Sequence, residues 1–118
     1  MKKIVVIDDE PKIRNLFCRT LHETGYEALE AEDGKEGLRL LKEDKNIGLV
    51  ILDIRLPKIN GLAIFDAIKT YSPQVKVIIS SVYSHDEQEF LIGGADDYYY
   101  KSDSILDLID KVYNCINE

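Results

Sequence analysis

Five polar residues stand at the ends of short apolar segments of this chain. They are Asp8, Asp9, Asp53, Ser81 and Lys101. Carboxylate oxygens are ligands that Mg²⁺ prefers, whereas a hydroxyl and an ammonium group can donate hydrogen bonds to phosphoryl oxygens. If the fold brings the five groups together, they predict a small site for a divalent cation and for phosphoryl chemistry. Three clustered carboxylates are costly to bury unless a cation neutralises them, which favours this interpretation over simple turn solvation or helix capping.

The elements that must position these groups alternate along the chain. Apolar segments that resemble strands are followed by amphipathic patterns with helical spacing. The expected strands are 4–7, 26–31, 49–52, 75–80 and 97–100, and the expected helices are 11–24, 33–43, 61–71, 84–94 and a last helix capped by Ser102 or Asp103. This order predicts an α/β fold with a doubly wound (βα)5 parallel sheet in a three-layer α/β/α sandwich. Because ligands bind at the carboxyl ends of such strands, the five polar groups are expected at one edge.

Length and composition narrow the class of protein. The 118 residues are expected to form one domain, 1–118. A net charge of −7 argues against non-specific nucleic-acid binding, which needs a basic surface. No apolar stretch approaches the roughly 20 residues of a membrane span, and no signal peptide precedes the first strand, so a cytoplasmic location is expected. Cys18 and Cys115 lie in helical patterns without C-x-x-C spacing, and we expect buried free thiols.

Four separated blocks of the sequence are similar to a known family. They are VIDDE at 6–10, LDIRLP at 52–57 with Gly61, IISS at 78–81, and GADDYYYK at 94–101. In type, order and spacing they resemble the receiver domain of response regulators, over essentially the whole chain. The resemblance implies the flavodoxin-like strand order 2-1-3-4-5. It also implies a two-component signalling protein that catalyses its own phosphorylation and dephosphorylation but turns over no external substrate.

The resemblance implies a role for each acidic residue. Asp53 would accept a phosphoryl group from a sensor histidine kinase or a phosphotransfer protein. Asp8, Asp9 and Asp53, together with the main-chain carbonyl of Arg55, would hold Mg²⁺, with Asp9 as the more direct ligand of the first two.

Three further roles follow from the same resemblance. Lys101 and Ser81 would bind phosphoryl oxygens. Ser81 and Tyr98 would form the switch, in which Tyr98 turns inward as Ser81 moves. This motion would change the face made by the fourth helix, the fifth strand and the fifth helix. An unidentified downstream protein or output domain would bind there, and phosphorylation could drive homodimer formation.

Three features depart from the family pattern, one of which is that Tyr99 and Tyr100 enlarge the aromatic cluster beyond what the switch needs. Val82 stands where the family usually has Ala or Gly, and its size could narrow access to Asp53. Ser102 stands where a proline commonly follows the lysine, and we expect a trans Lys101–Ser102 bond and a looser loop.

Two alternatives remain open. One is a phosphorylation-independent interaction scaffold with the same fold, which Val82 and Ser102 favour. The other is a haloacid-dehalogenase-like phosphatase with an aspartyl nucleophile, although DIR at 53–55 lacks the second acid of that pattern.

Overall fold

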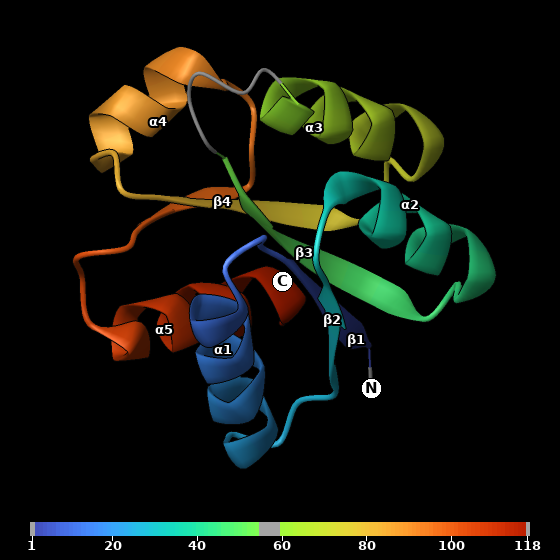
Figure 1. Ribbon diagram of the computed structural model, residues 1–118, viewed down its shortest axis with the longest axis horizontal. Coiled ribbons are helices and arrows are strands. Elements are labelled where there is room, and N and C mark those ends of the chain that lie inside the picture. Colours follow the sequence, from blue (N-terminus) through green and yellow to red (C-terminus); the bar gives the residue numbers. More distant parts are fainter. Residues whose placement is uncertain (1, 55–59, 118) are drawn as a thin grey trace.

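The computed structural model describes residues 2–54 and 60–117, in which strands and helices alternate (Figure 1). The strands are β1 (Lys3–Ile7), β2 (Ala28–Ala31), β3 (Ile47–Asp53), β4 (Lys76–Ser81) and β5 (Asp97–Tyr100). The helices are α1 (Pro11–Glu23), α2 (Gly34–Glu43), α3 (Asn60–Tyr71), α4 (His85–Leu91) and α5 (Ile105–Ile116). The predicted alternation of five strands and five helices is confirmed.

The strands form one parallel sheet in the order β2-β1-β3-β4-β5. This is the predicted order, and it places 28–31 at an edge as expected. Helices α1 and α5 cover one face of the sheet, and α2 and α3 lie on the other, with α4 near β4 and β5 (Figure 1). The chain is therefore a three-layer α/β/α sandwich with the central strands covered on both sides.

Side-chain alternation along the strands builds two cores. In β1, Ile4 and Val6 pack with α1 and α5 residues such as Phe17 and Leu108. Val5 and Ile7 point to the opposite face and pack with the core that contains Phe65. Because both faces are covered, β1 and β3 are continuous apolar runs that end abruptly at acidic residues.

Local signals in the sequence fix several helix ends. Pro11 begins α1, where its missing N–H leaves no helical bond unmade. Gly25 follows α1 with a φ of 103°, a left-handed conformation that glycine adopts without a Cβ penalty. The Asp33 side chain caps α2 by accepting from the Glu36 amide. Ser84 and Glu87 form a capping box at the start of α4.

The structure corrects several predicted boundaries, among them those of the third strand, which runs over Ile47–Asp53 rather than 49–52. Strand β2 begins at Ala28 rather than residue 26, because the Tyr26 amide donates to the Leu21 carbonyl and closes the end of α1. The fourth helix ends at Leu91, before the two glycines. Ser104, not Ser102 or Asp103, caps α5, and its hydroxyl accepts from the Leu106 amide.

Two expectations about the whole chain concern its thiols and membrane insertion. Cys18 and Cys115 are both buried, and neither forms a disulfide within the described residues, as predicted. Burial raises the pKa of Cys18 to about 12, so this thiol stays protonated near neutral pH. Within 2–54 and 60–117, no helix has the length and apolar character that crossing a membrane requires.

Candidate metal and phosphoryl site

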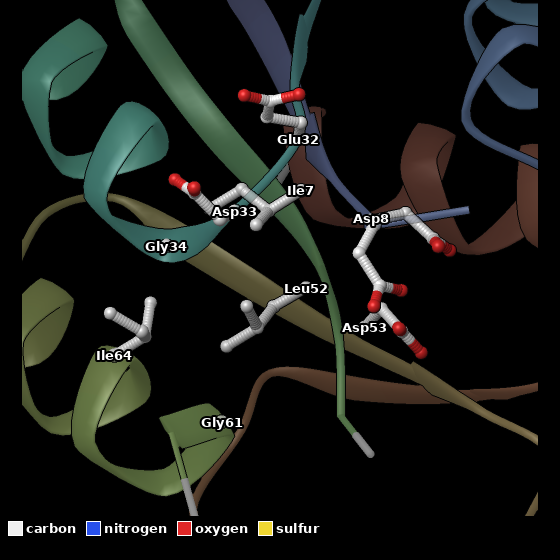
Figure 2. A pocket seen from close by; sticks show the side chains of 10 residues that line it. Ile7, Asp8, Glu32, Asp33, Gly34, Leu52, Asp53, Gly61 and Ile64 are labelled. Atoms are coloured by element: carbon white, nitrogen blue, oxygen red, sulfur yellow. The ribbon is translucent and has the colours of Figure 1, made fainter. Parts of the chain in front are cut away.

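The three predicted carboxylates lie together at the carboxyl edge of the sheet. Asp8 directly follows β1, and Asp53 is the last residue of the neighbouring strand β3. Asp8, Asp9 and Asp53 each offer a carboxylate oxygen, and these oxygens lie within 4.8 Å of one another. Figure 2 shows Asp8 and Asp53 side by side, across a hollow from Ile64 on α3. Two strand ends and one turn thus gather three negative charges at one place.

Lys101 joins this cluster from the end of β5. Its Nζ donates to Asp53 Oδ1 at 2.9 Å and to Asp8 Oδ2 at 3.0 Å. Its main-chain amide donates to the Ser81 carbonyl at 2.7 Å, which extends the β4–β5 pairing by one bond. Lys101 therefore lies beside Asp53 and Asp8, even though Ser102 replaces the usual proline.

Burial makes the electrostatics of these groups strong. The Asp8 and Asp53 side chains are only 2% and 7% exposed. Burial raises the pKa of Asp53 to about 6, against the opposing effect of the hydrogen bond and charge of Lys101. Burial lowers the pKa of Lys101, but its hydrogen bond to Asp53 and the nearby carboxylate charges outweigh this, and the pKa lies above its usual value. Near neutral pH, Asp53 is therefore mostly ionised beside a full positive charge.

The donor set fits a magnesium ion. Mg²⁺ favours hard oxygen ligands and usually binds one or two carboxylates while keeping several waters. Asp8 is buried, Asp53 is partly buried and Asp9 is exposed, so the cluster has a closed side and an open side. The three carboxylates concentrate negative charge at one place, which a divalent cation can neutralise.

A second hollow opens beside Asp53 and gives a route to its carboxylate. Its lining includes Asp53, Lys101, Val82, Tyr83 and Ser102. Val82 is 70% exposed, so its side chain stands at the rim and is not buried in the core. A phosphoryl donor that enters here would pass Val82, the residue that departs from the family pattern.

Ser81 and Tyr98, the predicted switch residues, lie on neighbouring strands. Ser81 is fully buried, and its hydroxyl accepts a hydrogen bond from the Tyr83 amide at 3.2 Å. The Tyr98 hydroxyl donates to the Ile92 carbonyl at 2.6 Å, just after α4, and accepts from the Ala95 amide at 3.3 Å. The Tyr98 side chain is thus tied to the α4–β5 connection, while its movement on activation stays a prediction.

The tyrosines that flank Tyr98 follow the alternation of β5. Tyr98 packs against the core on the α2–α3 side, whereas Tyr99 is buried on the α1–α5 side. Tyr99 packs edge-on against Phe17, with ring centroids 5.9 Å apart. Tyr100 remains partly exposed.

One predicted ligand lies outside the described residues, and other polar residues were missed. Arg55, whose carbonyl was predicted to hold the metal, falls in 55–59, which the structure does not describe. Glu32 and Asp33 line the hollow beside Asp8 and Asp53, called the acidic hollow below (Figure 2). Their position just after an edge strand could have indicated that they lie near the site. Gln88 was also missed, because a polar residue in a short helical pattern gives no signal that it is buried.

Comparison with known proteins gives one consistent family. The model of the response regulator receiver domain matches residues 4–113. The response regulator TrrA of Thermotoga maritima, solved with Mg²⁺-BeF, is 40% identical with a TM-score of 0.85, covering 98% of this chain and 99% of that one. TrrA has also been solved with the histidine kinase ThkA; that match has a TM-score of 0.81 at 40% identity and covers 98% of each chain.

Curated relatives are longer than this chain. A probable transcriptional regulatory protein of Picosynechococcus sp. is 34% identical, over 91% of this chain and 46% of its own length. The chain spans less than half the length of this relative and of the others matched first. These matches favour a receiver over the phosphatase alternative.

Proposed function

This chain belongs to the response regulator receiver family, and we propose that it accepts a phosphoryl group on Asp53 from a sensor histidine kinase or phosphotransfer protein in a Mg²⁺-dependent reaction. The observation that carries the proposal is the position of Lys101, whose Nζ bridges Asp53 and Asp8 at 2.9 and 3.0 Å. This contact brings together the ends of β1, β3 and β5, and phosphoryl transfer would need groups from all three.

Asp53 acts as the nucleophile in this proposal. One of its carboxylate oxygens bonds to phosphorus as the phosphorus–nitrogen bond of the donor phosphohistidine breaks, and the imidazole leaves with a proton from solvent. Attack requires ionised Asp53, and its pKa of about 6 leaves the carboxylate mostly charged near neutral pH. In-line approach takes place through the hollow that Asp53 shares with Val82 and Lys101.

The remaining polar groups stabilise the charge that spreads over the phosphoryl oxygens. Lys101 releases an oxygen of Asp8 or Asp53 and binds a phosphoryl oxygen, and the Ser81 hydroxyl donates a second hydrogen bond. Asp8, Asp9 and Asp53, together with the Arg55 carbonyl, would hold Mg²⁺. When bound, Mg²⁺ would neutralise part of the negative charge of the carboxylate and phosphoryl oxygens.

Signalling follows from the Ser81–Tyr98 pair. When Ser81 moves toward the phosphoryl group, its hydroxyl leaves the Tyr83 amide, and Tyr98 gives up its bonds beside Ile92 to turn inward. The α4–β5–α5 face then changes. In Tyr98→Ala, phosphorylation should proceed at the wild-type rate, while the change in amide hydrogen exchange over 84–100 on phosphorylation should be lost. A full exchange response in this variant would contradict the switch.

The partners in this proposal are proteins. The kinase docks at the phosphoryl site, and a downstream protein or an output domain reads the α4–β5–α5 face, with homodimer formation as one result of phosphorylation. The protein works in the cytoplasm and turns over no external substrate. Relatives that are transcriptional regulatory proteins support an output role in gene regulation.

The decisive experiment measures the phosphoryl adduct. Intact mass is recorded after incubation with acetyl phosphate, with and without Mg²⁺, for the wild type, Asp53→Ala and Glu32→Gln. Glu32 is the matched control, because it lines the acidic hollow outside the carboxylate cluster. We expect a Mg²⁺-dependent, base-labile adduct in the wild type and Glu32→Gln but not in Asp53→Ala. No adduct, even with a phosphohistidine donor, would favour the phosphorylation-independent scaffold.

A further inference from the structure

We propose that Arg14 is a positioning residue for the metal site, because it fixes the main chain from which the Asp8 and Asp9 carboxylates project. The inference deepens the proposed function and rests on its Mg²⁺ site. Arg14 lies on α1 and belongs to none of the motifs that predicted the site.

Arg14 links the acidic turn to the edge strand. Its Nη1 donates to the Asp8 carbonyl oxygen at 2.8 Å, and its Nε donates to Glu30 Oε1 on β2 at 2.9 Å. The Arg14 side chain is only 16% exposed. A planar guanidinium holds its donors in a fixed geometry, so the Glu30 contact also fixes the donor that reaches Asp8. The bond from Arg14 is thus part of a rigid bridge between α1, the β1–α1 turn and β2.

The Asp8 residue is held at every polar atom. Its amide donates to the Ala31 carbonyl at 3.1 Å. Its Oδ1 accepts from the Glu10 amide at 2.9 Å, and its Oδ2 accepts from Lys101 at 3.0 Å. Arg14 supplies the fourth contact, to the carbonyl. A cation at the cluster would compete with Lys101 for Asp8 Oδ2. The hydrogen bonds to the main chain of Asp8 would then be more important for orienting its side chain.

The contact also orients Asp9. The carbonyl of Asp8 and the amide of Asp9 belong to one planar peptide unit, so a donor that fixes the carbonyl fixes the plane from which Asp9 continues. Asp9 is exposed, and its carboxylate oxygen lies within 4.8 Å of those of Asp8 and Asp53. The Arg14 bond therefore preorganises the exposed ligand as well as the buried one.

Charge and position predict opposite effects of removing Arg14. A guanidinium near a cation site repels the cation, so losing its charge alone should tighten Mg²⁺ binding. Loss of a contact that orients a metal ligand should instead weaken binding, by about tenfold for a partner just outside the ligand shell. The sign of the change in Mg²⁺ affinity therefore distinguishes a positioning residue from an ordinary surface ion pair.

The test compares Arg14→Met with Arg39→Met at constant ionic strength. Arg39 also pairs with carboxylates, Glu36 and Glu43, but it lies on α2 and lines neither of the hollows that Asp53 lines. MgCl₂ is titrated into ¹⁵N-labelled protein while the amide shifts of 8–10 and 53 are followed. We expect Mg²⁺ to bind Arg14→Met about tenfold more weakly than the wild type, and Arg39→Met to match the wild type. Binding to Arg14→Met that is unchanged or tighter would overturn the proposal.

Two further measurements cover the other outcomes. Arg14→Lys keeps the charge but offers a single point donor, so its affinity for Mg²⁺ should lie between those of the wild type and Arg14→Met. If Arg14→Met does not fold, a wild-type Mg²⁺ affinity in Arg14→Lys overturns the proposal. Hydrogen exchange at the Glu10 amide, which bonds to Asp8, is measured without metal and should be faster in Arg14→Met. If the amide shifts of the wild type do not change with Mg²⁺, the proposed function is refuted. In that case, hydrogen exchange at the Glu10 amide that is no faster in Arg14→Met than in the wild type also refutes the role of Arg14.

Discussion

Gln88 Nε2 lies 2.8 Å from the carbonyl oxygen of Tyr99, so a side chain of α4 is hydrogen bonded to the main chain of the edge strand β5 inside the protein. The same nitrogen donates to the Tyr83 carbonyl at 2.6 Å, next to the turn that follows β4. The Gln88 side chain is fully buried, and its Oε1 accepts no hydrogen bond from the described residues. Polar contacts therefore help to hold α4 on the sheet, beside the proposed switch.

Replacing Gln88 with methionine keeps the volume but removes both donors. Because the Tyr83 and Tyr99 carbonyls then lose a partner, the free energy of unfolding should fall by about 1–3 kcal/mol. Urea denaturation measures this loss, with Glu89→Gln, an exposed neighbour on the same helix, as the control. If Gln88→Met unfolds with an equal or higher free energy, burial of the Oε1 atom destabilises the wild type by at least as much as the two hydrogen bonds stabilise it.

The Asp53 carboxyl should give the metal-free protein a distinct pH dependence. Its folded pKa of about 6 exceeds the model-compound value of 3.8, so the folded state holds this proton more tightly than the unfolded state. The associated stability is present below about pH 4 and is lost as the pH rises through about 6. Asp53→Asn removes the ionisation, so without Mg²⁺ the variant should be more stable than the wild type by about 3 kcal/mol near pH 7.5.

The comparison at two pH values separates this effect from packing changes. Near pH 4, Asp53 is largely protonated in the folded state, so the advantage of Asp53→Asn should shrink. Saturating Mg²⁺ should stabilise the wild type much more than the variant, since binding to the folded state raises its stability. An advantage of the same size at both pH values would show that packing, not ionisation, causes it.

Most of the site could be predicted because strand ends are readable in the sequence. Asp8, Asp53 and Lys101 each end an apolar segment, and parallel pairing brings such ends to one edge. The cap of α5 could not be chosen, because Ser102, Asp103 and Ser104 have similar capping ability. The Tyr99 hydroxyl donates to the Asp103 carbonyl at 2.8 Å, a tertiary contact within this turn that no local pattern encodes.

Val82 should control access by small phosphoryl donors. Its side chain is 70% exposed and lines the hollow beside Asp53, so Val82→Ala opens the entrance without leaving a cavity in the core. The rate of phosphorylation by acetyl phosphate should rise, on the order of tenfold for each 1.4 kcal/mol of relieved hindrance, and hydrolysis of the adduct should also become faster. Unfolding free energy should change by less than about 0.5 kcal/mol. Both rates come from timed intact-mass spectra, and unchanged rates would refute the steric explanation.

Lys101→Met should separate the two roles of the lysine. The substitution removes the ammonium group that pairs with the buried Asp8 and Asp53 side chains, so the metal-free protein should lose about 3–5 kcal/mol of stability. Lys111→Met is the control, because Lys111 has one partly exposed partner, Asp97, and its loss should cost about 1 kcal/mol or less.

The same variant should bind Mg²⁺ more tightly than the wild type but be phosphorylated more slowly. Lys101 occupies oxygens of both Asp8 and Asp53, so removing it frees those oxygens, and the rise in melting temperature on adding Mg²⁺ should be larger than in the wild type. Phosphorylation by acetyl phosphate should nevertheless be slower, because the phosphoryl oxygens lose a charged donor. If Lys101→Met binds Mg²⁺ more tightly and is phosphorylated at the wild-type rate, Lys101 only neutralises the carboxylate cluster and takes no part in phosphoryl transfer.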